Sequence, residues 1–322
     1  MDSSTKAGAF PAIDHLSLAA CLCRPQSKPD VILDTDTYNE IDDQFALAYL
    51  INAHKECNVK AICAAPFYSP PDSGRVYRSQ SPEDGMELSY NEIKKVLRLM
   101  GREDLFPIVY RGSRFYLPDE ATPAESSAAE AIIDLSTSYS ADNPLYVIAI
   151  GAITNVASAL LIDPTLRERV MVIWLGGHAH HWGNCTDFNM VQDIAAARVV
   201  FGCGVPLVQV PCLGVTSEFR FTKPELEHLF RGKNALCDYL LDNTYQYMAQ
   251  KTHLAQWSKP LWDVAAVAWV LGGDFALQRI VPSPIPQQDF SYGLDPNRHP
   301  MLYVYHIKKD ELTEDLVKKL IN

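Results

Sequence analysis

The feature that most constrains the fold of this 322-residue chain is a regular alternation of short apolar runs with amphipathic segments. The apolar runs are rich in Val, Ile and Leu, as is typical of strands that are covered on both faces. They lie at residues 31–35, 59–65, 106–112, 145–151, 169–177 and 206–212. Segments with helical spacing follow at residues 42–54, 86–100, 126–140, 154–163 and 193–202. This order predicts an α/β fold with a mostly parallel central sheet flanked by helices and a Rossmann-like core.

The rest of the chain predicts one domain, because it contains no repeat, low-complexity tract or obvious linker. A more helical region, a turn-rich excursion, a last strand and a last helix are expected at residues 219–275, 282–300, 301–307 and 310–322. We expect this domain to cover residues 31–322. Residues 1–30 are predicted to form a poorly ordered or loosely docked extension, because Asp14 and His15 interrupt any signal-peptide core.

Charge and composition exclude several classes of protein. The formal net charge of −11 argues against nucleic acid or an anionic membrane as the main partner. No apolar run reaches the roughly 18–20 residues that span a bilayer. Eight cysteines in a chain of this length indicate a reduced compartment, so we expect a cytoplasmic protein. Cys21 and Cys23 form a pair without the second pair that a zinc site needs.

Five acidic residues crowd the junction between the first strand and the first helix: Asp34, Asp36, Glu40, Asp42 and Asp43. In parallel sheets, ligands bind at the carboxyl ends of the strands, where this cluster falls. Asp34 and Asp36 are two apart on an extended chain, so their side chains are expected to point the same way. The helix dipole could explain Asp42 or Asp43 alone. Repulsion within the whole cluster calls for protons, bases or a metal ion.

Three kinds of acidic site could account for this pattern. A calcium-binding EF-hand loop beginning at Asp34 would need Gly and Glu where Asn39 and Phe45 stand. A phosphatase with Asp34 as the nucleophile fits "DTDTY", but no later Gly-Asp-x-x-x-Asp motif follows a strand. The third kind is an oxygen-ligated hard cation, with Ca²⁺ as the expected ion.

Four motifs in order, "DTD…DD", "GAITN", "GN…DFN" and "WD", resemble the nucleoside hydrolase family of inosine–uridine type N-ribohydrolases. The resemblance extends from about residue 31 to the C-terminus. It implies calcium-dependent hydrolysis of the N-glycosidic bond of ribonucleosides to ribose and free base. It also implies a role in nucleoside salvage, and relatives of this kind commonly form homodimers or homotetramers.

The resemblance also implies roles for individual residues. The expected calcium ligands are Asp36, Asp43, Asp263 and the main-chain carbonyl of Ile150, and Asp36 would deprotonate a calcium-bound water. The expected substrate-binding residues are Asp42 for the ribose 2′-hydroxyl, Asn184, Asp187 and Asn189 for the sugar, and Trp262 for the base. Asp34 and Asn155 are expected to support the site.

The chain departs from the family pattern in the turn of its first motif. Five residues separate Asp36 from Asp42 where well-known members have three, so the turn must bulge. Asn39 or Glu40 could then reach the site or face water.

A second departure concerns the leaving base. Trp262 stands where many members have a His that protonates the base, which favours purine nucleosides stacked on the ring, although ordinary packing would also place a Trp there. A second stacking ring could come from Phe67, Tyr68, Trp182 or Tyr247. The acid could come from His178, His180 or His181, which otherwise form a solvated rim. A nucleoside-binding homologue without catalysis therefore stays open beside the hydrolase, with the phosphatase less favoured.

Overall fold

The computed structural model, which describes residue 10 and residues 14–321, is built around an eight-stranded sheet. Its strand order is β3-β2-β1-β4-β5-β6-β12-β9. Neighbouring strands run parallel except β9, which is antiparallel to β12. The strands are β1 (Asp30–Thr35), β2 (Asn58–Ala64), β3 (Val109–Arg111), β4 (Leu145–Ala149), β5 (Val170–Leu175), β6 (Leu207–Val210), β9 (Ala276–Pro282) and β12 (Pro300–Ile307). The predicted fold class is confirmed.

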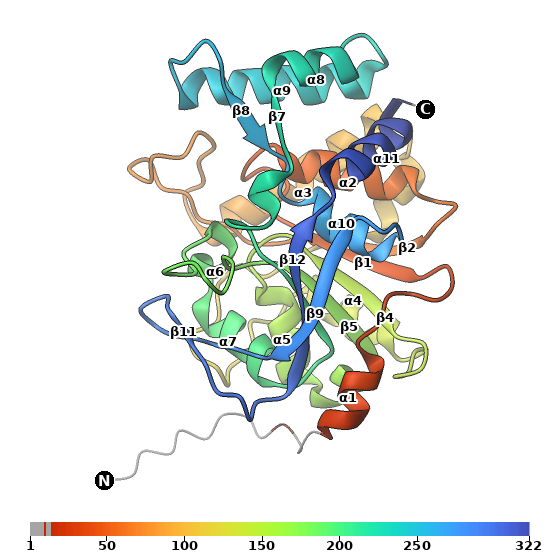
Figure 1. Cartoon of the computed structure of the whole chain (residues 1–322), viewed down its shortest axis with the longest axis vertical. Helices are drawn as coiled ribbons and strands as arrows, with labels where there is room; N and C mark the ends of the chain where they lie inside the picture. The colour runs from red at the N-terminus through yellow and green to blue at the C-terminus, as the bar shows by residue number, and fades with distance from the viewer. Residues whose placement is uncertain (1–9, 11–13, 322) are drawn as a thin grey trace.

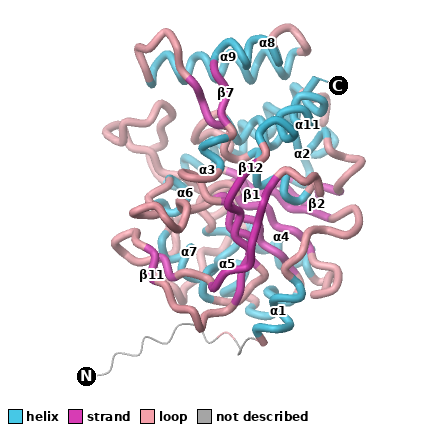
Figure 2. The backbone as a smooth tube through the Cα atoms, viewed as in Figure 1, coloured by secondary structure: helices cyan, strands magenta, loops and turns pink. Residues whose placement is uncertain are grey.

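Helices cover both faces of this sheet (Figures 1 and 2). Val31 and Leu33 of β1 pack in one buried cluster with α2, α3 and α10, whereas Ile32 between them packs in the other with α4, α5 and α7. Strands with apolar side chains on both faces are therefore buried on both faces. The helices are α1 (His15–Cys21), α2 (Asp42–Asn52), α3 (Pro82–Leu99), α4 (Ser127–Ser136), α5 (Thr154–Ile162), α6 (Phe188–Gln192), α7 (Ile194–Gly202), α8 (Lys223–Phe230), α9 (Ala235–Lys251), α10 (Val264–Val270) and α11 (Lys309–Ile321), with 3₁₀ turns η1 (Glu103–Ile108), η2 (Pro164–Glu168) and η3 (Thr216–Glu218).

Several strands were not predicted. The edge strand β9 was missed because it has only one neighbour and exposes Leu277 and Ile280, so it lacks the apolar character of the central strands. Two further pairs form small antiparallel ribbons: β7 (Arg220–Thr222) with β8 (Ser258–Pro260), and β10 (Ile285–Pro286) with β11 (Tyr292–Gly293). The first ribbon leads to α8 and α9, which lie together beyond the end of the sheet (Figure 1).

The predicted N-terminal extension falls partly outside the described residues. Of residues 1–30, the structure leaves out 1–9 and 11–13. In the part that it describes, Leu18 and Leu22 are buried, and Arg24 donates a hydrogen bond of 2.7 Å to the carbonyl of Ala276. The division between extension and domain stays a prediction. Within residues 14–321, no helix is both long and apolar enough to cross a bilayer.

The strand order places a binding crevice between β1 and β4. From β1 the chain moves outward to β2 and β3, and it then returns with β4 on the other side of β1. Such a reversal leaves a crevice at the carboxyl ends of the two strands, where ligands bind in open α/β sheets. Asp36 follows β1 and Ile150 follows β4, so both residues stand at this crevice.

Candidate active site

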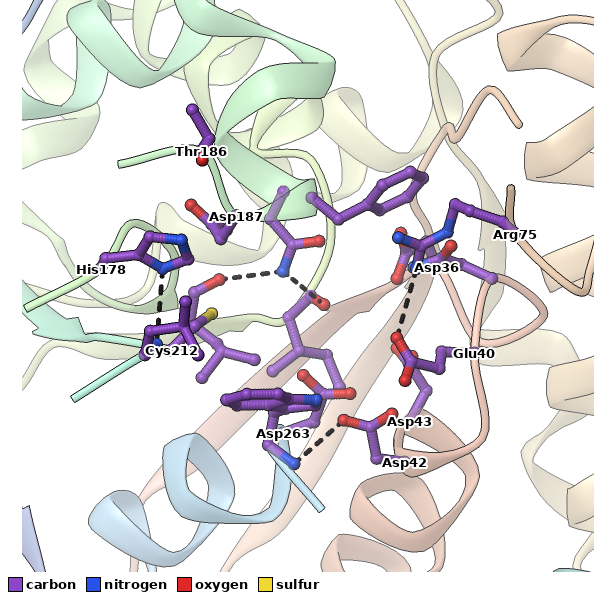
Figure 3. A pocket seen from close by; sticks show the side chains of 17 residues that line it. Asp36, Glu40, Asp42, Asp43, Arg75, His178, Thr186, Asp187, Cys212 and Asp263 are labelled. Carbon is purple, nitrogen blue, oxygen red and sulfur yellow. Dashed lines mark hydrogen bonds and ion pairs between the residues drawn. The ribbon is translucent and has the colours of Figure 1, made fainter. Parts of the chain in front are cut away.

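A cavity of about 380 Å³ opens at the carboxyl ends of β1 and β4 (Figure 3). It is lined by Asp36, Asn39, Glu40, Asp42, Asp43, Arg75, Ile150, Leu175, His178, Thr186, Asp187, Phe188, Asn189, Cys212, Leu213, Trp262 and Asp263. Most residues that the sequence predicted for the site are therefore brought together. Asp34, Asn155 and Asn184 do not line the cavity.

Four carboxylates line the same part of the cavity, and burial determines their chemistry. Asp42, Asp43 and Asp263 can each place one oxygen within 4.8 Å of the others. Asp36 is fully buried, and neither of its carboxylate oxygens has a hydrogen-bond partner among the described residues. Burial, with the charge of Asp43 next, raises the pKa of Asp36 well above its ordinary value. Burial and the neighbouring Asp42 raise the pKa of Asp43 to about 7.

These oxygens fit a hard divalent cation. Carboxylates without protein partners in a buried site need either protons or a positive charge, and Ca²⁺ takes about 6–8 oxygen ligands. Asp263, at the start of α10, makes no side-chain capping bond, so its carboxylate is not used to cap the helix. Burial first, and then the charges of Asp42 and Asp43, raise its pKa well above the ordinary value.

Asp34 and Asp36 do not share the cavity, in contrast to the expectation from their spacing. The strand β1 ends at Thr35, so the strand alternation does not continue to Asp36. Asp34 instead accepts a hydrogen bond of 2.8 Å from the side chain of Asn155. Asn155 accepts in turn from the backbone N–H of Ser113 at 2.8 Å. Asp34 and Asn155 thus tie β1 to α5 and to the chain that follows β3.

The segment that follows β5 contacts the main-chain carbonyl of Ile150, which the resemblance assigns to the metal. The side-chain amide of Asn189 donates to the carbonyls of Ile150 (3.0 Å) and Leu175 (2.9 Å). A carbonyl has two lone pairs, so the Ile150 oxygen keeps capacity for another partner. Asp187 caps α6 and accepts from the backbone N–H of Gly177 at 2.6 Å. Burial raises the pKa of Asp187 to about 7.

Asn184 does not join this group. Its side chain accepts hydrogen bonds from the backbone N–H and the hydroxyl of Thr186, at 3.2 and 2.7 Å, and it is exposed. It therefore stabilises the turn before Asp187 and leaves Thr186 to line the cavity. A role for Asn184 in binding the sugar stays a prediction.

Of the three loop histidines, His178 alone lines the cavity. Its Nδ1 accepts from the backbone N–H of Leu213 at 3.4 Å, and burial lowers its pKa. His180 is bound to Gln209 at 2.8 Å. The four rings considered as stacking partners, Phe67, Tyr68, Trp182 and Tyr247, do not line the cavity. Trp262 does line it.

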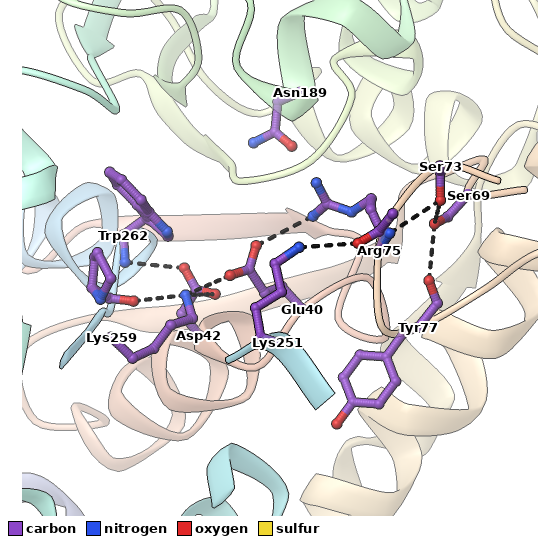
Figure 4. Close-up of polar contacts among 12 residues, drawn as sticks. Glu40, Asp42, Ser69, Ser73, Arg75, Tyr77, Asn189, Lys251, Lys259 and Trp262 are labelled. Carbon is purple, nitrogen blue, oxygen red and sulfur yellow. Dashed lines mark hydrogen bonds and ion pairs between the residues drawn. The ribbon is translucent and has the colours of Figure 1, made fainter. Parts of the chain in front are cut away.

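Sequence reasoning missed two cations at this site, Lys259 and Arg75. Figure 4 shows Lys259 between Glu40 and Asp42, with its Nζ 2.6 Å and 3.4 Å from their carboxylates. Asp42 also accepts from the backbone N–H of Trp262 at 3.0 Å. Burial opposes ionisation of Glu40, yet Lys259 and Arg75 outweigh it and lower the pKa of Glu40. The longer turn, which the sequence did indicate, is what brings Glu40 to these cations.

Comparison with known proteins identifies similar chains. A family model described as "Inosine-uridine preferring nucleoside hydrolase" matches residues 82–301, more than half of the chain. The matched segment excludes the acidic motif of residues 34–43. A "Probable uridine nucleosidase 2" of Arabidopsis thaliana is 29% identical over 143 residues, which cover 42% of this chain and 44% of the relative. A "Putative pyrimidine-specific ribonucleoside hydrolase RihB" of Shigella dysenteriae is 28% identical over 184 residues, which cover 55% of this chain and 63% of the relative.

These two matches each span less than two thirds of the relative's length. Solved structures match over more of the chain. A "Plant nucleoside hydrolase - PpNRh1 enzyme" has a TM-score of 0.72 at 18% identity and covers 91% of this chain and 99% of its own. A "Purine-Preferring Ribonucleoside Hydrolase from Gardnerella vaginalis" has a TM-score of 0.72 at 19% identity and covers 91% and 98%. At these identities the structural matches establish the fold alone.

Proposed function

Since the chain belongs to the inosine-uridine preferring nucleoside hydrolase family, we propose that it hydrolyses the N-glycosidic bond of ribonucleosides to ribose and free base. The observation that carries this proposal is Asp36. A buried carboxylate with two unpartnered oxygens faces a cavity lined by four further Asp side chains, those of Asp42, Asp43, Asp187 and Asp263. In its ionised form, a carboxylate whose oxygens have no protein partner can accept a proton from water.

A bound Ca²⁺ would be held by Asp36, Asp43, Asp263 and the Ile150 carbonyl, and it would lower the pKa of the attacking water and bind vicinal ribose hydroxyls. The donor set is made entirely of oxygens, which suits this ion. We propose Ca²⁺ on that chemistry and on the unpartnered oxygens described above.

The reaction then proceeds with roles for the chain's own residues. The oxygen of water bonds to C1′ of the ribose as the C1′–N bond breaks and its electron pair moves to the base. Asp36 takes one proton of that water and later releases it to solvent, and solvent gives one proton to the departing base, so that overall the OH of water is added to ribose and its H to the base. The sugar passes through a state with positive charge near C1′, which the surrounding carboxylates stabilise.

The remaining site residues bind the substrate. Asp42, fixed by Lys259 and by the Trp262 N–H, would accept a hydrogen bond from the 2′-hydroxyl. Asp187 and Asn189 would bind other sugar hydroxyls, and Trp262 would stack on the base, consistent with a purine. Asp34 lies outside the cavity and is bound to Asn155, which argues against a phosphatase with Asp34 as the nucleophile.

The metabolic role, the compartment and the oligomeric state are part of the same proposal. We propose nucleoside salvage in the cytoplasm, because all eight cysteines lie in the described residues and are free thiols. A homodimer or homotetramer is proposed from the family resemblance.

Ribose release from a panel of nucleosides tests the proposed function. We expect wild-type protein with Ca²⁺ to release ribose from at least one purine nucleoside, and chelation to remove this activity. Reducing-sugar detection with chromatography of the free base measures both products. Tight binding of a nucleoside without any ribose released would favour the binding protein without catalysis.

A second expected result concerns stability, pH and Ca²⁺. In metal-free protein the pKa of Asp34 and Asp43 is about 7, against 3.8 for an unperturbed Asp. Between about pH 4 and 7 the folded state therefore holds more protons than the unfolded state, and the free energy of unfolding falls as pH rises. Because Ca²⁺ binds deprotonated carboxylates, it should raise the Tm more at pH 8 than at pH 5.

Thermal denaturation with Ca²⁺ or chelator at both pH values measures this effect. Asp119→Asn, an exposed acid outside the cavity, serves as a control and should keep the full Ca²⁺ shift. A Tm that Ca²⁺ leaves unchanged at pH 8 would contradict calcium binding at the carboxylates.

A further inference from the structure

The turn-rich excursion at residues 282–300 folds against the loop between β5 and α6, residues 176–187. Its two short strands, β10 and β11, form a ribbon that packs beside α7 (Figure 1). Near one end of the loop, the backbone N–H of Cys185 donates to the carbonyl of Phe290 at 2.7 Å. At the other end the ribbon supplies Tyr292 of β11. The ribbon therefore contacts this loop at both of its ends, although about a hundred residues separate the two in the sequence.

The hydroxyl of Tyr292 lies directly on the start of the loop. It donates a hydrogen bond of 3.2 Å to the carbonyl of His178, and it accepts one of 2.9 Å from the side-chain amide of Gln209. The same amide of Gln209 also donates to the carbonyl of Gly176 at 3.0 Å. Tyr292 and Gln209 therefore hold the chain on both sides of the residue that lies between Gly176 and His178.

That residue is Gly177, and the Tyr292 hydroxyl packs against its backbone. Gly177 has a φ of +76°, which glycine adopts without strain. A side-chain carbon added to Gly177 would lie 1.9 Å from the Tyr292 oxygen, so the hydroxyl occupies the space that a side chain would fill. The backbone N–H of Gly177 donates to the carboxylate of Asp187 at 2.6 Å. The contacts thus run from Tyr292 through Gly177 to Asp187.

Asp187 is the residue at which these contacts reach the cavity. Its carboxylate is buried and lines the cavity, on the same side as His178 (Figure 3). Its second oxygen accepts from the backbone N–H of Met190 at 3.2 Å. Each carboxylate oxygen keeps a further lone pair for a ligand. The direction in which Asp187 presents these lone pairs is therefore set by Met190 at one oxygen and by Gly177 at the other.

We infer that Tyr292 is a positioning residue that holds Asp187 in place to bind the sugar, an inference that rests on the proposed function. Tyr292 does not line the cavity, so its hydroxyl acts on a substrate through a residue that does. Binding groups have to be held within about 0.5 Å of their productive positions by the residues behind them. Asn189 needs no help from the ribbon, because the carbonyls of Ile150 and Leu175 fix its amide.

A double-mutant cycle of Tyr292→Phe and Asp187→Asn tests this role with the nucleoside that wild type cleaves fastest. We expect Asp187→Asn to lower kcat/KM by about 10- to 10²-fold, because a hydrogen bond to a charged group is lost. Tyr292→Phe should lower it by about 5- to 10-fold in the wild-type background and by less than about twofold in the Asp187→Asn background. Tyr292→Phe keeps the ring, so we expect the variant to stay folded at the assay temperature, which its Tm checks.

Tyr303→Phe is the matched control. The Tyr303 hydroxyl accepts from the backbone N–H of His180 at 3.2 Å, so this change also removes a hydroxyl from the same loop, away from Gly177. We expect its kcat/KM to stay within about twofold of wild type. An equal loss in Tyr303→Phe would overturn the inference, because any loosening of the loop would then act alike. So would a loss in Tyr292→Phe that is as large without the Asp187 carboxylate as with it.

Hydrogen exchange of the Gly177 amide, followed by NMR, separates this inference from the proposed function because it needs no substrate. We expect this amide to exchange at least about fivefold faster in Tyr292→Phe than in wild type, and at the wild-type rate in Tyr303→Phe. Faster exchange in a protein that releases no ribose would overturn hydrolysis and retain Tyr292 as the residue that positions Asp187. Unchanged exchange in Tyr292→Phe would overturn the role of Tyr292 whether or not ribose is released.

Discussion

Asp36→Asn should reduce ribose release by about 10³-fold or more while leaving the fold intact. The amide cannot take a proton from water, and general bases typically contribute about 10²–10⁴-fold. The change also removes one oxygen donor for the proposed Ca²⁺. Because burial and Asp43 already disfavour the charged form of Asp36, a neutral amide of the same shape should not unfold the protein. We expect metal-free Asp36→Asn to be at least as stable as metal-free wild type at pH 8.

Steady-state kinetics and thermal denaturation with chelator measure the two effects separately. Asp163→Asn is the matched control: Asp163 caps η2 and pairs with Arg169, and neither residue lines the cavity, so the activity of this variant should stay within about twofold of wild type. Activity retained in Asp36→Asn would exclude Asp36 as the base. Activity lost together with the fold would assign it a structural role.

The fold could be predicted from the sequence because its signal is local and repeated. Each central strand is an apolar run whose alternate residues face two different helix layers, as Val31, Ile32 and Leu33 do in β1. A pattern of this kind can be recognised without knowing which strands and helices pack against it. The edge strand β9 has solvent on one side and one partner strand, so its sequence carries no comparable pattern.

The site also contains residues that the sequence predicts and residues that it does not. Asp36, Asp42 and Asp43 are close in the sequence, so their convergence follows from one strand and the helix after it. Lys259 meets Asp42 across 217 residues, and Arg75 reaches the cavity from a loop with no recognisable motif. Neither contact has a local signal. The long turn around Glu40 was the one sequence feature that pointed toward Lys259 and Arg75, because an additional acid near the cluster requires a compensating positive charge.

Lys259→Met should lower the free energy of unfolding by about 3–5 kcal/mol, the cost of leaving a buried ion pair with one member. Lys259 is 4% exposed, and its Nζ contacts the carboxylates of Glu40 and Asp42 and the carbonyl of Pro260. Without it, the buried carboxylate of Asp42 loses its cationic partner, and the partly buried carboxylate of Glu40 keeps Arg75 alone. Although burial alone would lower the pKa of Lys259, Asp42 and Glu40 reverse that effect and raise it, so Lys259 is charged in the native protein.

A double-mutant cycle with urea denaturation identifies the cause of this loss. Adding Glu40→Gln to Lys259→Met removes one of the two carboxylates that Lys259 contacts, so the pair should recover about 1–3 kcal/mol relative to the sum of the single changes. Lys60→Met, which breaks the partly exposed pair with Asp30, should cost at most about 1 kcal/mol. Additive effects of Lys259→Met and Glu40→Gln would mean that Lys259 stabilises by packing alone. In that case the contacts of Lys259 with Glu40 and Asp42 would not stabilise the protein through charge.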